Sequence, residues 1–157
     1  MRKWQEKWAD SGGRKGAWTK ALIPEISKWV NRRHGELTYG LAQILTGHGK
    51  FQSYLQKIGR TPTDKCVYCS INEADDVIHT LYKCEAFQGI RRSLVISEGQ
   101  NGLQALKNKV SEMLESAEKW EETVREIDSI MRHKTHLERQ NIASDAANGA
   151  GNEVPDE

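Results

Sequence analysis

The stretch CVYCSINEADDVIHTLYKC, residues 66–84, contains all three cysteines of this 157-residue chain. Its possible metal donors follow the spacing C-x2-C-x9-H-x4-C. They are Cys66, Cys69, His79 and Cys84. Structural zinc sites bind four thiolate or imidazole groups in a tetrahedron, which leaves no position for a catalytic water. We therefore predict one structural zinc ion held by these four side chains.

One disulfide with an incidental histidine is the alternative interpretation of the three cysteines. A secreted location would favour it, but residues 1–8 lack the apolar segment of a signal peptide. The chain also has no run of about 18 apolar residues, the length that a membrane-spanning helix needs. We therefore expect an intracellular protein, nuclear or cytoplasmic, with no membrane partner. Cysteines stay reduced in those compartments, which favours a metal site over disulfides.

Apolar residues recur at three- and four-residue spacing along most of the chain, a pattern typical of amphipathic helices. Pro24 suits the first position of one helix, and residues 87–96 and 103–114 are expected to form two more. A last helix carries acids near Trp120 and bases near Lys134, as the helix dipole favours. Runs of alternating β-branched residues are scarce. The sequence therefore predicts a mainly α fold of about six or seven helices.

Composition divides the chain into four parts. We expect a basic, tryptophan-containing helical region over residues 1–60 and the zinc-binding segment over residues 61–97. Residues 98–140 are expected to form the C-terminal helices, and residues 141–157 a disordered acidic tail with little to bury. Only 37% of the chain is hydrophobic, so the metal would supplement a modest core as a staple of a small helical domain.

Charge is distributed unevenly along the chain, although the net charge is only +1. Residues 1–65 contain thirteen Lys and Arg against five Asp and Glu, which gives a net charge of +8. Residues 66–140 have a net charge of −3, and residues 141–157 one of −4. A basic segment with interleaved aromatic residues suits a polyanionic partner. Ordinary solvated faces are the alternative explanation.

Two motifs that suggest catalysis have simpler explanations. Asp75 and Asp76 resemble the paired aspartates of a polymerase palm, but no strand pattern flanks them and no third carboxylate accompanies them. Either one is better explained as the N-cap of a helix that carries His79. The Gly47-His48-Gly49 segment lacks the lysine and hydroxyl partner of a phosphate-binding loop and is expected to be a turn. We therefore expect no catalytic residues in this chain.

Several blocks of sequence together carry a resemblance to a known family. They are Trp18-Thr-x-x-Leu22-Ile23-Pro24, Trp29-x-x-Arg32-x-His34-Gly35-Glu36, Leu45-Thr46-Gly47-His48-Gly49-x-Phe51-x-x-Tyr54-Leu55 and the cysteine–histidine stretch. In this order, over about residues 4–140, they resemble the carboxy-terminal region of the reverse-transcriptase polyprotein of non-LTR (LINE-like) retrotransposons. The nine-residue spacer before His79 is longer than the four residues of retroviral nucleocapsid knuckles, so the stacking geometry of those knuckles does not carry over.

The resemblance implies a zinc-binding knuckle that follows a polymerase, the RNA-directed DNA polymerase of the parent protein. It also implies the same ligands, Cys66, Cys69, His79 and Cys84, and a role in holding RNA or target DNA during target-primed reverse transcription. This chain alone is then expected to have no enzymatic activity and no small-molecule substrate.

Two functions follow from the residues and the resemblance. The first is nucleic-acid binding, in which basic side chains contact phosphates of RNA or DNA. The candidates are Arg32, Arg33, Lys50, Lys57, Arg60, Lys65, Lys83, Arg91 and Arg92. Tyr54, Tyr68 or Phe87 could stack on an unpaired base, although the helical register of Tyr54 favours core packing. The second is a protein-docking module, in which zinc staples the helices and tryptophans dock onto a polymerase body.

Overall fold

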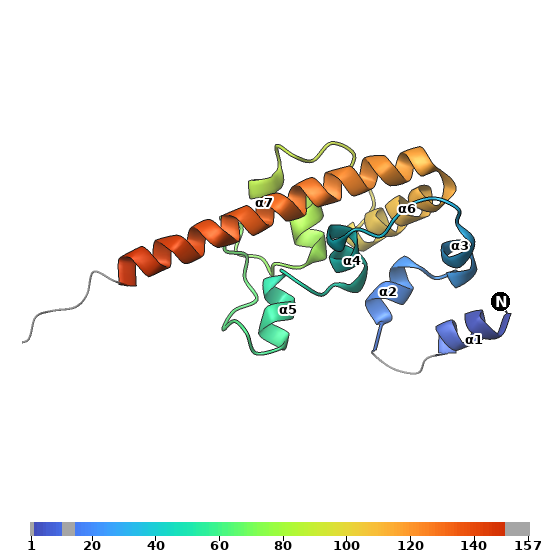
Figure 1. The fold of residues 1–157 in the computed structure, drawn as a ribbon, viewed down its shortest axis with the longest axis horizontal. Coiled ribbons are helices and arrows are strands. Elements are labelled where there is room, and N and C mark those ends of the chain that lie inside the picture. The colour runs from blue at the N-terminus through green and yellow to red at the C-terminus, as the bar shows by residue number, and fades with distance from the viewer. Residues whose placement is uncertain (1, 11–14, 150–157) are drawn as a thin grey trace, which may run out of the picture.

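A computed structural model describes residues 2–10 and 15–149 as helices joined by connections, the longest of which run over residues 58–78 and 88–101 (Figure 1). The elements are α1 (Arg2–Asp10), α2 (Ala17–Leu22), α3 (Ile26–Asn31), α4 (Tyr39–Thr46), α5 (Gln52–Lys57), the π-helix η1 (His79–Lys83), the 3-10 turn η2 (Glu85–Phe87), α6 (Gly102–Glu115) and α7 (Ala117–Gly149). Within these described residues the only β-type pairing is one antiparallel bridge between Lys65 and Ala74. The prediction of a mainly α fold is confirmed.

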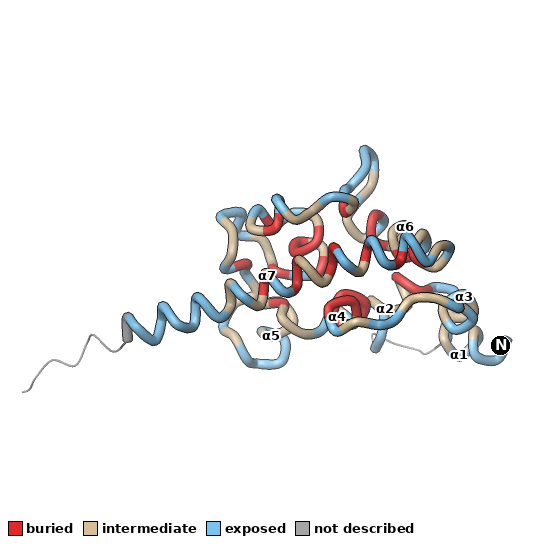
Figure 2. The backbone as a smooth tube through the Cα atoms, turned by 45° about the horizontal axis from the view of Figure 1, so that its top comes forward, coloured by how far each residue is buried: buried red, intermediate tan, exposed pale blue. Residues whose placement is uncertain are grey.

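Helix α7 is the longest element and runs the length of the core (Figure 1). Helix α6 packs along it as the other arm of a helical hairpin, and α4 and η1 also contact it. Helix α2 lies against both α4 and α6, and α1 contacts α3. Figure 2 shows that the buried residues gather where α4, α6, η1 and the first part of α7 meet.

The core is formed by one apolar face from each of these helices. Its main members are Leu41, Ile44 and Leu45 of α4, Leu106, Val110 and Met113 of α6, and Trp120, Ile127, Ile130 and Met131 of α7. Their three- and four-residue spacing places the apolar side chains on one face of each helix. A short helix is marginally stable alone, so packing these faces together stabilises the helices.

Residues 87–96 differ from the helix that the apolar spacing predicted. Beyond η2 the chain continues as a turn, a bend and irregular backbone. The carboxylate of Glu126, on α7, accepts hydrogen bonds from the amides of Arg92 (2.7 Å), Ser93 (3.0 Å) and Leu94 (3.2 Å). These amides would donate to backbone carbonyls in a helix. A side chain distant in sequence therefore replaces helical hydrogen bonding here.

Replacing Glu126 by Gln is expected to lower the free energy of unfolding by about 1.5–3 kcal/mol, the size of a hydrogen bond to a charged group. Burial alone would raise the pKa of Glu126, but the hydrogen bonds from Arg92 and Ser93 outweigh it and lower the pKa. A carboxylate with a lowered pKa stabilises the fold above its ordinary pKa, and this contribution is lost as pH falls. The difference in the free energy of unfolding between wild type and variant, measured by urea unfolding, should therefore shrink at acidic pH.

The matched control for this substitution is Glu122→Gln, which changes an exposed carboxylate one turn earlier on α7. It should alter stability by less than about 0.5 kcal/mol, as is usual for surface sites. Equal effects of the two substitutions at neutral pH would contradict the assigned role of Glu126.

The segment around Pro24 also differs from the prediction. Helix α2 precedes it, and Pro24 lies before α3 rather than at its first position. The side chain of Gln5 explains the displaced start, because it donates to the carbonyl of Pro24 (2.8 Å) and accepts from the amide of Ile26 (3.0 Å). Contacts with α1 thus decide where α3 begins.

The predicted disordered tail differs from the structure at its beginning, because α7 continues to Gly149. Residues 141–149 contain three alanines and no proline, a composition that favours continuing a helix. Residues 141–147 of these last turns are exposed (Figure 2). The remainder of the predicted tail, residues 150–157, lies outside the described residues, as do residues 11–14 of the predicted basic region. Across the described ranges, no helix is both long and apolar enough to span a membrane.

Candidate metal centre

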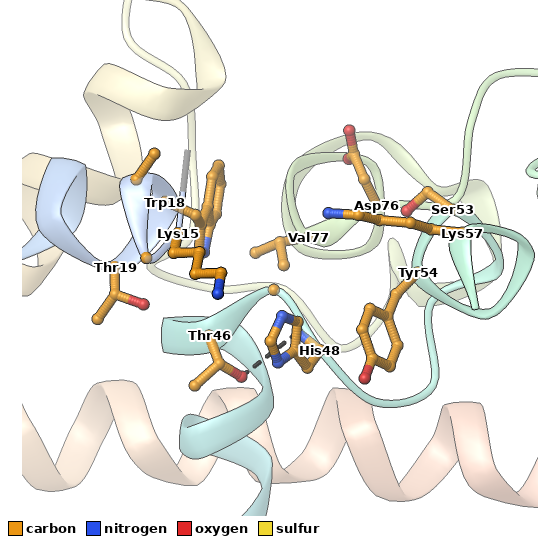
Figure 3. A pocket seen from close by; sticks show the side chains of 13 residues that line it. Lys15, Trp18, Thr19, Thr46, His48, Ser53, Tyr54, Lys57, Asp76 and Val77 are labelled. Carbon is orange, nitrogen blue, oxygen red and sulfur yellow. Dashed lines mark hydrogen bonds between the residues drawn. The ribbon is translucent and has the colours of Figure 1, made fainter. Parts of the chain in front are cut away.

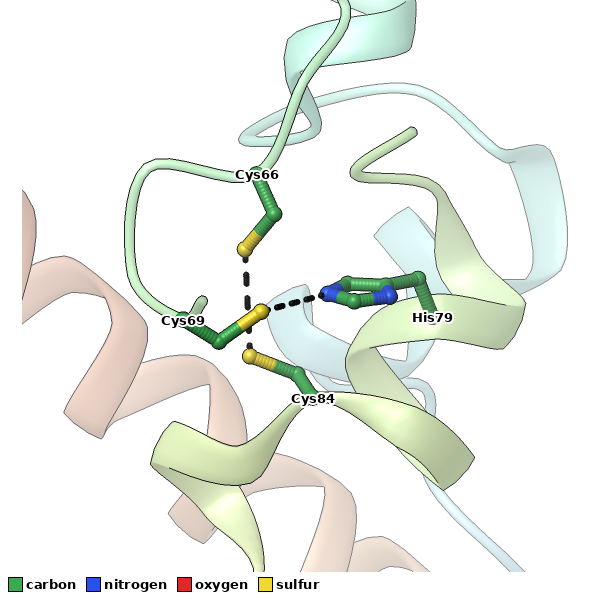
Figure 4. A group of neighbouring side chains, drawn as sticks. All are labelled: Cys66, Cys69, His79 and Cys84. Carbon is green, nitrogen blue, oxygen red and sulfur yellow. Dashed lines mark hydrogen bonds between the residues drawn. The ribbon is translucent and has the colours of Figure 1, made fainter. Parts of the chain in front are cut away.

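The four predicted ligands lie together, and their side chains point toward a common centre (Figure 4). Their donor atoms all lie within 4.8 Å of one another, slightly wider than the separation of about 4 Å expected for a bound metal. The sulfurs of Cys66 and Cys84 are 3.8 Å apart, and the sulfur of Cys69 is 3.4 Å from Nε2 of His79. Tetrahedral bonds of about 2.0–2.3 Å give separations of about 3.3–3.8 Å. This Cys3His cluster therefore has the dimensions of a metal site.

Backbone hydrogen bonds close the loop that presents the first two cysteines. The amide of Cys66 donates to the carbonyl of Glu73 (2.9 Å), and the amide of Asp75 donates to the carbonyl of Asp64 (2.8 Å). These bonds flank the isolated bridge and hold both ends of the loop together. The amide of Tyr68 donates to the sulfur of Cys66 (3.4 Å), which places the turn against that sulfur.

The other two ligands come from the ends of the π-helix η1. In an α-helix, residues five apart would point about 140° away from each other. The amide of Cys84 instead donates to the carbonyl of His79 (2.7 Å), an i to i+5 bond that widens the turn. His79 and Cys84 therefore face the same side. Asp75 or Asp76 was predicted to be the N-cap of the helix that carries His79. The prediction is confirmed for Asp76, whose Oδ1 accepts a hydrogen bond from the amide of His79 (2.8 Å).

A carboxylate lies behind the histidine, just beyond hydrogen-bond distance. Nδ1 of His79 is buried and lies 3.6 Å from Oε2 of Glu73, while Nε2 faces the cluster. Lys83 donates to the same carboxylate (2.9 Å) and lowers the pKa of Glu73. A carboxylate behind a histidine is the usual means of fixing which ring nitrogen binds a metal.

The cluster can hold negative charge before any cation binds. A hydrogen bond from the Cys84 thiol lowers the pKa of Cys66 to about 5, and the same bond together with burial raises the pKa of Cys84. Thiolate is the form of cysteine that binds metals.

The other aspartate of the pair, Asp75, has a structural partner that the sequence analysis did not identify. Its carboxylate is fully buried and forms an ion pair with Lys134 of α7, which is also fully buried. It also accepts hydrogen bonds from the hydroxyl of Thr80 and the amide of Gln52, both at 3.0 Å. Lys134 lies over the ring of Phe51, 5.1 Å from its centroid. This network fixes the metal-binding loop to α7.

The predicted phosphate contacts fall into two groups. The first group is exposed and comprises Arg33, Lys57, Arg60, Lys65 and Arg92, of which Lys65 lies 4.0 Å from the carboxylate of Asp64. Lys83 is exposed too, but its ammonium pairs with Glu73. The remaining four predicted contacts are at least partly engaged within the protein. Lys50 pairs with Glu138 of α7, Lys83 with Glu73, and Arg91 donates to the carbonyl of Cys84.

Arg32 is the fourth of these engaged residues. Its guanidinium lies 4.2 Å from the ring centroid of Trp29 and 4.9 Å from that of Trp120. It also donates to the carbonyl of Trp29 (2.6 Å). Arg32 therefore contributes to packing between α3 and α7.

The three predicted stacking residues have different surroundings. Phe87 is fully buried, and the half-buried ring of Tyr68 lies 5.2 Å from the ammonium of Lys134. Tyr54 is half-buried and stacks on exposed His48, with ring centroids 4.5 Å apart. Of these three residues, only Tyr54 borders a cavity, which lies between α2, α5 and the turn that follows α4.

The sequence analysis missed Lys134 and Glu126 as buried charges. A signal was present for Lys134, since it continues the buried stripe of Ile127, Ile130 and Met131 at helical spacing. A charged residue on an apolar stripe requires a buried partner. No comparable signal identifies which acid that partner is.

The fold and the site define the chain as a small helical module built around one Cys3His cluster. Comparison with known proteins confirms the resemblance to Pol polyproteins of non-LTR retrotransposable elements. The chain is 31% identical over 88 residues to the retrovirus-related Pol polyprotein from type-1 retrotransposable element R1 2 of Nasonia vitripennis. This match covers 56% of this chain and 20% of the relative. It is 34% identical over 90 residues to the corresponding R1 polyprotein of Bradysia coprophila, covering 56% of this chain and 8% of the relative.

A third similar protein is the R1 4 polyprotein of Nasonia vitripennis, 28% identical over 107 residues, or 65% of this chain and 25% of the relative. The chain thus spans a quarter or less of the length of these relatives. The similarity supports a retrotransposon-derived region. No family model matches the chain, and no solved structure matches it.

Proposed function

We propose that this chain is a zinc-stapled module that binds RNA or DNA without catalysing a reaction, as part of a retrotransposon reverse transcriptase. In the full-length parent it would assist target-primed reverse transcription beside a polymerase body. The observation that carries the proposal is the Cys3His cluster in a chain similar to retrotransposon Pol polyproteins.

The donor set supports zinc as the bound ion. Three sulfurs and one imidazole suit zinc in a tetrahedron, and four protein donors complete its coordination. The ligands are held by a closed loop, a π-turn and a supporting carboxylate, which are features of a structural site. One zinc per chain, measured by elemental analysis of the purified protein, is the expected result.

Exposed bases near the metal centre support the nucleic-acid partner. Lys57 lies on α5, and Arg60 and Lys65 lie on the segment that leads from α5 to the first cysteine. All three side chains are exposed, and the contact of Lys65 with Asp64, at 4.0 Å between exposed groups, is weak enough to yield to a phosphate. Contacts of this kind provide affinity that depends steeply on salt and little on base sequence.

Reversing Lys57, Arg60 and Lys65 to Glu is expected to weaken binding of a labelled oligonucleotide and to flatten its salt dependence. Each lost phosphate contact should reduce the slope of log K against log salt by about 0.7–0.9. Fluorescence anisotropy at several salt concentrations measures both effects. The matched control reverses three exposed bases of α7, Lys119, Arg125 and Arg132, and changes net charge equally. Equal losses in both triple variants would show that only net charge matters.

A protein-docking module is the second candidate, favoured by the 58% exposure of Trp4 on α1. The other four tryptophans are packed within this chain. Trp8, Trp18 and Trp120 donate to backbone carbonyls of Ile23, Ile44 and Glu36, and Trp29 packs on Trp120. Few aromatic side chains therefore remain for a docking surface. A docking module would bind oligonucleotides weakly and would be indifferent to the charge reversals.

A further inference from the structure

A cavity of about 680 Å³ lies between α2, α5 and the turn that follows α4 (Figure 3). Its volume is within the range of about 300–1,000 Å³ that is usual for ligand sites. Its lining includes the rings of Trp18, His48 and Tyr54 and the side chain of Val77. The cavity borders the core through Val77, and none of the four cluster ligands lines it.

The Thr46-Gly47-His48-Gly49 turn forms one edge of this cavity. The hydroxyl of Thr46 accepts from the amide of His48 (3.3 Å). Gly47 has φ +67°, and a Cβ there would lie 3.3 Å from the ring of Trp18. Gly49 has φ +111°, and a Cβ there would lie 2.1 Å from Oε1 of Gln43. The two glycines therefore allow a tight turn that presents the imidazole of His48 at the cavity.

Aromatic rings occupy opposite sides of the cavity. His48 and Tyr54 are stacked with an angle of 24° between their planes, and Figure 3 shows both on one side with Trp18 on the other. The indole nitrogen of Trp18 donates to the carbonyl of Ile44 (2.9 Å), which holds that ring in place. Flat rings fixed in this way form a surface on which another flat, conjugated group can stack.

Two cationic groups complete the site. The exposed lysines Lys15, in the turn before α2, and Lys57, the last residue of α5, line the cavity, and their ammonium groups point toward the space between the rings (Figure 3). Asp76 also lines the cavity, but its carboxylate already accepts a hydrogen bond from the amide of His79 (2.8 Å). Aromatic walls flanked by cations match a base with phosphates on either side.

We infer that this cavity takes one unpaired base of single-stranded nucleic acid. The base stacks on the His48–Tyr54 pair, and Lys15 and Lys57 contact the adjoining phosphates. The inference rests on the proposed nucleic-acid binding. It adds the place where one base is held and requires the strand to be unpaired at that base. RNA and DNA share this chemistry, so both are included in the test.

The test compares labelled oligomers of deoxythymidylate and uridylate with an abasic deoxyribose-phosphate oligomer of the same length, using fluorescence anisotropy on the full chain. The abasic oligomer keeps the phosphates and lacks the bases. One stacked base should make the base-containing oligomers bind about 5- to 150-fold more tightly. His48→Ala should remove most of this preference, while Tyr54→Phe, which keeps the ring, should retain it.

The matched control is His136→Ala, which removes an exposed histidine of α7 and should leave the preference unchanged. Circular dichroism of each variant checks that the fold is intact. Equal binding of abasic and base-containing oligomers, preference for duplex, or loss of the preference in both histidine variants would overturn the inference while leaving the proposed function standing. Absence of binding to every oligomer and to duplex would overturn both.

Discussion

Removing the metal from the Cys3His cluster is expected to lower the melting temperature of this protein by at least about 10 °C. Structural zinc contributes directly to folding free energy, and a loss of 1 kcal/mol lowers the melting temperature of a domain this size by about 2–4 °C. The cluster joins the loop before Glu73 to the π-turn, so both segments should loosen when the metal leaves. Calorimetry with and without a chelator measures the shift.

The Cys69→Ser variant should reproduce the effect of the chelator and should bind less than one zinc per chain. Val67→Ser is its control, because Val67 lies in the same loop and is 51% exposed. The control should keep both its zinc and its melting temperature. A wild-type melting curve that the chelator leaves unchanged would contradict a structural role for the site.

Replacing Lys134 by Met is expected to destabilise the protein by about 3–5 kcal/mol. The change leaves the carboxylate of Asp75 buried without its cation, and an uncompensated buried charge is costly. Asp75→Asn should cost a similar amount because it leaves the Lys134 ammonium unpaired. The double variant should lose less than the two single variants combined, since neither charge then remains. Urea unfolding of all four proteins provides this double-mutant cycle.

The control on the same helix is Lys119→Met, which removes an exposed ammonium group. It should change the free energy of unfolding by less than about 0.5 kcal/mol. Additive losses in the double variant, or a loss below 1 kcal/mol for Lys134→Met, would contradict the role assigned to the buried pair.

Elements that depend on local pattern were predicted from the sequence. Residues 103–114 and the helix from Trp120 were predicted as helices because their apolar spacing matches the period of an α-helix over several turns. The prediction over residues 87–96 was wrong although the spacing was similar. There the amides of Arg92, Ser93 and Leu94 donate to Glu126, about 33 residues away in sequence.

The sequence by itself determined the mainly helical fold and the four residues of the Cys3His cluster. Both depend on residue types at short, regular spacing, which a single chain displays without reference to distant segments. Only the tertiary structure decided that His79 and Cys84 meet across a π-turn, and that Lys134 is a core residue paired with Asp75, 59 positions earlier. It also decided that Arg32 packs on tryptophans and that His48 faces a cavity. Charged and polar side chains have these roles because packing brings distant elements together, and spacing along the chain does not specify which partners meet.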